Sequence, residues 1–312
     1  MSSSNTINFS LRPNKGIERA IALDALQAGR EFLGPNSIYV GLGSLWFRDF
    51  VMAHRQLGID KIVSIEASEK IYERAEFNKP LACVEIVKGY TTDVLPGLLE
   101  RQDFQGRPVV VWLDYDSGLD DDRLTELTRL VERLPAGSAV LSTFSARAGA
   151  YADSAEDRAD ALGDYFGDLI DEDILIDKLK GVGLMQTLSS ATLEYLTAAA
   201  IDAGREGGFV PAISLMYRDS GPMVTVGGFL PQSEDAVACR ELVNDPKWFG
   251  FESTVIETQP LTLRELHALS QLVPVQRLKQ ADVANLGFRL DQSQLDFYCR
   301  HYSRYPSYVE IV

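Results

Sequence analysis

The stretch SIYVGLGS at residues 37–44 decides the fold, because a short apolar run ends there in a glycine turn. Four similar runs follow, with helical patterns between them: KIVSIEAS (61–68), CVEIVKG (83–89), PVVVWLDYD (108–116) and AGSAVLSTFSA (136–146). Wholly apolar strands that alternate with helices are typical of a parallel sheet covered on both faces. We therefore predict an α/β fold with a doubly wound, mostly parallel sheet, whose ligand site lies at the carboxyl ends of its strands.

After residue 149, the sequence predicts three further parts: an insertion, a terminal hairpin and a C-terminal domain. The core takes in residues 1–149, with 1–35 as a lid or helix, and an acidic helical insertion follows at 150–206. Residues 207–233 form a terminal hairpin, two strands around the turn Asp219-Ser220-Gly221-Pro222. Residues 234–312 are mainly helical in pattern and predict a small C-terminal domain.

Composition narrows the class of protein. The 30 basic and 45 acidic residues give a net charge of −15, which disfavours a general nucleic-acid binder and an anionic membrane surface. A small-molecule or protein substrate fits this charge better. The three cysteines, far apart and without a CxxC pair, are in keeping with a reducing compartment, so we expect a cytoplasmic protein. No window approaches the ~20 apolar residues of a membrane span.

Two features at the first two strand ends suit a nucleoside ligand. Gly41, Gly43 and Ser44 form a turn before a helix, where a ligand can approach the backbone and meet free amide groups. Glu66 ends the next strand, and a carboxylate there can accept hydrogen bonds from both hydroxyls of a ribose. A tight turn without a ligand and a solvated glutamate are the alternatives.

The next two strand ends are also polar. Thr92 and Asp93 lie in a loop that can reach an adenine amino group, although Asp93 could also cap the following helix. Asp114 and Asp116 lie two residues apart, on the same side of an extended chain, so they can converge on one ligand group. Buried carboxylates are costly without a partner, which favours a cationic ligand group; acids that cap the helix at 120–134 are the alternative.

In this order, YVGLGS, IVSIEAS, GYTTDVLPGL and VVVWLDYD resemble the successive motifs of class I S-adenosylmethionine (SAM)-dependent methyltransferases. The small-molecule O-methyltransferase branch is the most similar, and the resemblance covers residues 36–145 and 209–230. It implies an antiparallel last strand and SAM as the cofactor. It further implies a role for each matching residue: the methionine part at Gly41 and Gly43, the ribose at Glu66, the adenine at Asp93, and the reactive end at Asp114.

The motifs also depart from the family pattern. Tyr39 stands where an acidic residue usually precedes the glycines, and Ser44-Leu45 replace the last glycine. Metal-dependent O-methyltransferases carry an Asp-Asn pair after strand five, where this chain has residues 142–145, STFS, so we expect no catalytic metal.

The resulting hypothesis is a methyltransferase whose acceptor is an O- or N-nucleophile of a small molecule or of nucleic acid. Asp114 or Asp116 could take the acceptor proton. We expect the 150–206 insertion to cover the acceptor side of the pocket. Two alternatives stay open. One is a catalytically silent subunit of a larger assembly that binds a protein partner through the acidic insertion or the C-terminal domain. The other is an NAD-binding oxidoreductase.

Two further clusters have two interpretations each. Arg12, Lys15 and Arg19 could bind an anionic group, or they could form a solvated helix start in which Glu18 pairs with Lys15 or Arg19. The stretch 299–305, CRHYSRY, resembles a nucleic-acid contact, but a helix face that packs its tyrosines on the main domain is favoured.

Overall fold

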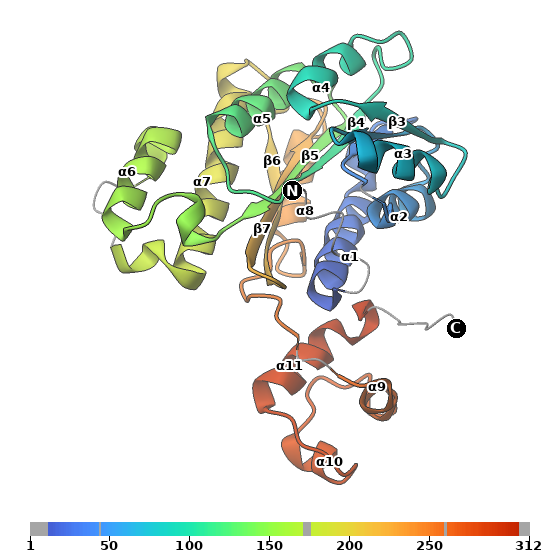
Figure 1. The fold of residues 1–312 in the computed structure, drawn as a ribbon, viewed down its shortest axis with the longest axis vertical. Coiled ribbons are helices and arrows are strands. Elements are labelled where there is room, and N and C mark those ends of the chain that lie inside the picture. The colour runs from blue at the N-terminus through green and yellow to red at the C-terminus, as the bar shows by residue number, and fades with distance from the viewer. Residues whose placement is uncertain (1–11, 44, 171–175, 259–260, 306–312) are drawn as a thin grey trace.

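The computed structural model describes residues 12–43, 45–170, 176–258 and 261–305, and these ranges contain one seven-stranded sheet (Figure 1). The strand order is β3-β2-β1-β4-β5-β7-β6, and all neighbours are parallel except β7, which runs antiparallel to both β5 and β6. The predicted fold class is confirmed. The strands are β1 Ile38–Gly41, β2 Ile62–Glu66, β3 Val84–Lys88, β4 Val109–Asp114, β5 Ser138–Ser145, β6 Val210–Arg218 and β7 Pro222–Leu230.

Helices cover both faces of this sheet. Apolar residues of α1, α2, α3 and α8 pack on one face, and those of α4, α5, α6 and α7 pack on the other. Among the helices that the structure describes, none is both long and apolar enough to cross a membrane. Their bounds are α1 Pro13–Ala28, α2 Arg48–Leu57, α3 Glu69–Phe77, α4 Thr91–Leu99, α5 Asp121–Arg133, α6 Ala155–Phe166, α7 Gly181–Asp202, α8 Ala236–Asn244, α9 Leu263–Ser270, α10 Gln280–Ala284 and α11 Gln292–His301.

Strand β4 shows why the apolar runs are continuous. Val109, Val111 and Leu113 pack in the core on the α5 side, whereas Val110 and Trp112 pack in the core on the α1 side. Successive side chains of a strand point to opposite faces, so a strand covered on both faces needs an apolar residue at every position.

The segment 150–206 does not cover the site in the way that the sequence predicts. Its longest helix, α7, packs on α5 and on the last two strands, with Leu184, Met185 and Leu188 fully buried. Each buried side chain of this size contributes roughly 1.5–3 kcal/mol. Helix α7 is therefore a covering helix of the sheet rather than a lid, and no described residue of 150–206 lines either of the cavities described below.

The separate C-terminal unit begins later than the predicted boundary at residue 234, because the first helix after the hairpin still belongs to the sheet domain. Helix α8 packs on β6 through Cys239 and Val243, in the same core as α1. Helices α9, α10 and α11 form a separate small core around Leu269 and Leu295, and they lie together below the sheet in Figure 1. Of the tyrosines in the stretch 299–305, Tyr302 packs against this small core and Tyr305 packs against both this core and the core of the sheet, so the predicted packing on the main domain applies to Tyr305.

Strand order also fixes where a ligand can bind. From β1 the chain moves outward to β2 and β3 and then returns to place β4 on the other side of β1. At such a switch point the connections leave in opposite directions, and a crevice opens beyond the carboxyl ends of the two central strands. Gly41 and Asp114 end these two strands.

Candidate cofactor site

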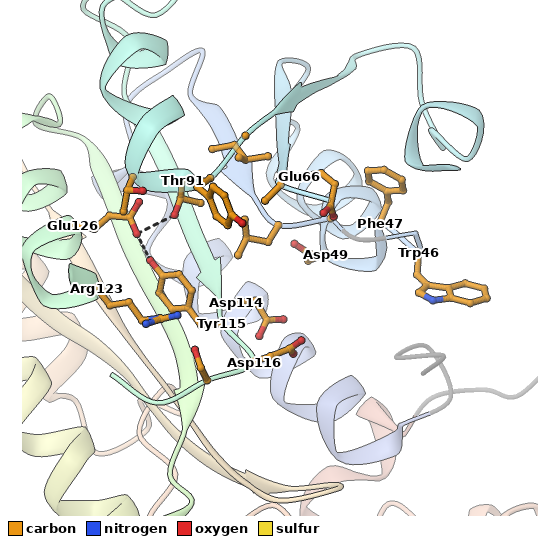
Figure 2. Close-up of a pocket in the computed structure, with 18 of the residues that line it drawn as sticks. Trp46, Phe47, Asp49, Glu66, Thr91, Asp114, Tyr115, Asp116, Arg123 and Glu126 are labelled. Carbon is orange, nitrogen blue, oxygen red and sulfur yellow. Dashed lines mark hydrogen bonds between the residues drawn. The ribbon is translucent and has the colours of Figure 1, made fainter. Parts of the chain in front are cut away.

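A cavity of about 600 Å³ lies at this switch point (Figure 2). The turns that follow β1 and β3 line it, together with the ends of β2 and β4 and parts of α1, α2, α4 and α5. The lining residues are Arg19, Leu42, Gly43, Trp46, Phe47, Arg48, Asp49, Ile65, Glu66, Ala67, Gly89, Tyr90, Thr91, Thr92, Asp114, Tyr115, Asp116, Ser117, Asp122, Arg123 and Glu126.

The glycine turn closes one side of the cavity. Gly43 lines it, and its amide donates a hydrogen bond to Ser64 Oγ at 3.1 Å. A Cβ atom at Gly43 would lie 2.6 Å from the Phe47 ring, so only glycine fits here. Phe47 has a left-handed φ of 48°, a conformation that costs a bulky residue about 1–3 kcal/mol and that clusters at ligand sites. Gly41 is not among the lining residues, and Ser44 lies outside the described residues.

Glu66 occupies the position that the sequence predicts. The side chain is half-buried at the end of β2, and Oε1 accepts a hydrogen bond from the Ser68 amide at 2.7 Å. Burial raises the pKa of this carboxyl, and the amide bond opposes that shift. Glu66 and Asp114 line the same cavity from β2 and β4 (Figure 2).

Of the two residues after β3 that are predicted to reach the ligand, only one lines the cavity. Thr92 lines the cavity, but Asp93 is exposed and is not among the lining residues. The carboxylate at this end is instead Glu126 of α5, which accepts hydrogen bonds from Thr91 Oγ1 at 3.0 Å and from the Tyr115 hydroxyl (Figure 2). Burial raises the pKa of Glu126.

Asp114 has a partner within the chain. Lys15 Nζ lies 2.8 Å from each of its carboxylate oxygens and 3.0 Å from Tyr217 Oη. The ammonium is 3% exposed and also lies 3.7 Å from Glu18, whose side chain is fully buried. The start of α1 is therefore not solvated, although the expected pairing of Lys15 with Glu18 is present. Asp114 thus does not depend on a cationic ligand for a partner, and Asp116 beside it is exposed.

Two further charged groups line the cavity: Asp49, which the sequence patterns do not single out, and Arg19, which they indicate only as part of a possible anion-binding cluster. Tyr39, which stands at the acidic position of the family motif, donates a hydrogen bond from its hydroxyl to Asp49 Oδ2 at 2.6 Å. Asp49, at the start of α2, then brings a carboxylate into the cavity from the next element along the chain. Burial raises the pKa of Asp49. A carboxylate is therefore present beside this position of the motif, on a residue ten positions later in the chain.

Arg19 is the second of these groups. Its side chain is 7% exposed and lines the cavity, and none of the described residues accepts a hydrogen bond from it or pairs with it within 4 Å. The charges of Asp49 and Glu18 stabilise the guanidinium, and because it lines the cavity a ligand there can reach it. Only its position one helical turn after Lys15 could have suggested that it faces the same side.

A smaller cavity of about 350 Å³ adjoins this one and shares Asp114 and Asp116 with it. It lies between the start of α1, the end of β5 and the turn between β6 and β7. The lining residues are Arg12, Lys15, Asp114, Asp116, Ser145, Arg147, Tyr217, Asp219, Ser220 and Met223.

This arrangement defines a class: doubly wound α/β proteins that hold a ligand at the switch point, with a glycine turn on β1 and a carboxylate at the end of β2. Within that class, residues 7–312 match the family described as "Putative O-methyltransferase", and the chain belongs to this family. The resemblance seen in the sequence motifs is thereby confirmed.

Several solved structures are similar to the chain. The cofactor-bound protein Rv0187 from MTB is 17% identical, with 74% of this chain and 85% of that chain covered and a TM-score of 0.43. The O-methyltransferase from Bacillus cereus in complex with SAH is 15% identical, with 73% and 86% covered and a TM-score of 0.42. Human N-acetylserotonin methyltransferase in complex with SAM is 11% identical, with 69% and 52% covered and a TM-score of 0.35. No curated protein matches the chain in sequence.

Proposed function

We propose that this protein transfers the methyl group of SAM to an oxygen atom of a small acceptor molecule. Family membership supports the reaction, and the cavity at the switch point supports the cofactor. The net charge of −15 favours a small acceptor over nucleic acid. The cysteines that the structure describes are all free, which is in keeping with a cytoplasmic location.

The position of Arg19, which lines the cavity and has no hydrogen-bond partner among the described residues, is the observation that carries this proposal. SAM joins an adenosine to an amino acid, so its site needs a ribose partner at one part and partners for a carboxylate and an ammonium at another. Glu66 suits the ribose hydroxyls. Arg19 and Asp49, on α1 and α2, offer a guanidinium and a carboxylate to the same cavity, which is the charge pattern complementary to an amino acid.

Little acid–base chemistry is required of the protein. SAM supplies a methyl group on a sulfonium, which is already a strong electrophile. The chain's own residues then have to orient the two reactants and exclude water, and orientation of this kind can contribute several kcal/mol. Asp114 is held by Lys15 at the border of the two cavities, and Asp116 next to it is accessible from both and is proposed to take the acceptor proton.

The proposal predicts that Arg19→Met weakens binding of S-adenosylhomocysteine (SAH) by about 10- to 100-fold, because a charge-assisted hydrogen bond contributes roughly 1.5–3 kcal/mol. Binding of 5′-methylthioadenosine, which lacks the amino-acid part, should stay within about twofold of the unsubstituted protein. Calorimetric titration with both nucleosides measures this. Equal losses for the two ligands would show that Arg19 supports the cavity as a whole and does not bind the amino-acid part.

A further inference from the structure

We infer that the smaller cavity binds the methyl acceptor, and that this acceptor is a small hydrophilic molecule with both a hydroxyl and an anionic group. The inference rests on the proposed function, which leaves the acceptor's chemistry open.

Position is the first argument. The two cavities have Asp114 and Asp116 in common, so a molecule in the smaller one lies against the same carboxylates that border the cofactor cavity. Methyl transfer needs the acceptor atom close to the methyl group, in line with the bond that breaks. The smaller cavity is therefore well placed for the second reactant.

Polarity is the second argument. Ligand cavities commonly measure about 300–1,000 Å³ and are mostly apolar. This one is near the lower end of that range, at about 350 Å³; apolar atoms make up the larger part of its surface, but nine of its ten lining residues end in a polar or charged group. A large or flat aromatic acceptor would leave these polar groups without partners, at roughly 1–3 kcal/mol each. A small acceptor with several hydrogen-bonding groups fits better.

Charge is the third argument. Arg147 follows β5, and its Nη2 donates to the Ser220 carbonyl at 2.6 Å. The guanidinium lies across Gly221, where a Cβ atom would be 2.3 Å from Nε. In the part of the chain that the structure describes, no carboxylate pairs with this exposed guanidinium within 4 Å, so a ligand in the cavity can bind it. A guanidinium held in place and without a counterion favours a ligand carboxylate or phosphate.

The positions of these groups orient the acceptor. Arg147 and Ser220 come from the end of β5 and from the β6–β7 turn, whereas Asp116 follows β4 beside the cofactor cavity. With its anionic group at Arg147, the acceptor directs its hydroxyl towards Asp116. The hydroxyl oxygen then bonds to the methyl carbon as the carbon–sulfur bond breaks. The electron pair of that bond stays on sulfur, and the hydroxyl proton passes to the Asp116 carboxylate.

Matched probes on the SAH-loaded protein test this inference. Glycerol 3-phosphate and glycerate carry a hydroxyl with a phosphate or a carboxylate, glycerol lacks the charge, and catechol is aromatic and uncharged. We expect at least one of the anionic probes to raise the melting temperature and to bind at least about tenfold more tightly than glycerol or catechol. The two anionic probes distinguish a phosphate from a carboxylate. Inorganic sulfate at equal ionic strength controls for a general salt effect.

Three variants locate the binding. Arg147→Met should weaken binding of the anionic probe by about 10- to 100-fold. Gly221→Ala, which displaces the guanidinium, should also weaken this binding. Arg55→Met, at an exposed arginine that lines neither cavity, should leave it unchanged. Binding that is unaffected by Arg147→Met, tighter binding of catechol, or no binding of either anionic probe would overturn the inference. SAH binding, measured on the same samples, distinguishes failure of this inference from failure of the proposed function. A protein that does not bind SAH would overturn the proposed function itself.

Discussion

Replacement of Glu66 by alanine is expected to weaken SAH binding by about 30- to 1000-fold, which corresponds to roughly 2–4 kcal/mol. The carboxylate is held at the end of β2 by the Ser68 amide and lines the proposed cofactor cavity. A carboxylate there can accept from both ribose hydroxyls, and charge-assisted hydrogen bonds are about twice as strong as neutral ones. Its removal leaves two ligand donors without partners.

Asp93→Ala provides the matched control. Asp93 is also a carboxylate beyond the end of a parallel strand, β3, but it is exposed and does not line the cavity, so its removal should change SAH affinity by no more than about twofold. Glu66→Ala should weaken the binding of 5′-methylthioadenosine as strongly as the binding of SAH. Arg19→Met, in contrast, should weaken only the binding of SAH. A Glu66→Ala variant that binds SAH normally would mean that the ribose lies elsewhere.

The second large effect is expected for Lys15→Met, which should lower the free energy of unfolding by roughly 3–5 kcal/mol. Lys15 bonds to Asp114 and Tyr217 and is the nearest cation to the fully buried Glu18. Without the ammonium, Asp114 loses this partner and the fully buried carboxylate of Glu18 is left where water cannot replace the cation. Urea unfolding followed by circular dichroism measures the loss.

A second substitution separates this electrostatic effect from a packing defect. Lys15→Met combined with Glu18→Gln removes the buried negative charge as well, and about half or more of the lost stability should return. Lys79→Met, at an exposed pair with Glu76, should cost less than about 1 kcal/mol. If the buried and the exposed lysine variants lost equal stability, the pairing of Lys15 would have no structural importance.

The sequence predicts the sheet well because a strand that is buried on both faces needs apolar residues at successive positions. Continuous apolar runs mark each parallel strand, and the residues that end β2 and β4, Glu66 and Asp114, reach the cavity as expected. Asp93 differs because the helix α4 begins at Thr91, two residues before it. At about 100° per residue, Asp93 points roughly 200° away from Thr91, which faces Glu126.

Side-chain pairs between segments that are distant in the sequence produce no such local pattern. Lys15 and Asp114 are 99 residues apart in sequence, and the pair depends on how α1 packs across the strand ends. The role of Tyr39 likewise follows only from the approach of α2, which places Asp49 within hydrogen-bond distance. The expected covering of the pocket by residues 150–206 does not hold for helix α7, whose own residues are largely apolar and pack in the core.

Calorimetric titration of the pure protein with SAM, SAH and NAD tests the central claim most directly. Binding of SAM and SAH at one site per chain, with no binding of NAD, is the predicted result, because Glu66, the proposed ribose partner, lines the same cavity as Arg19 and Asp49, the proposed partners of the amino-acid part. Binding of NAD without SAM or SAH would instead indicate an oxidoreductase. Failure of all three nucleosides to bind at millimolar concentration would contradict the assignment of this cavity to a cofactor and indicate a silent subunit.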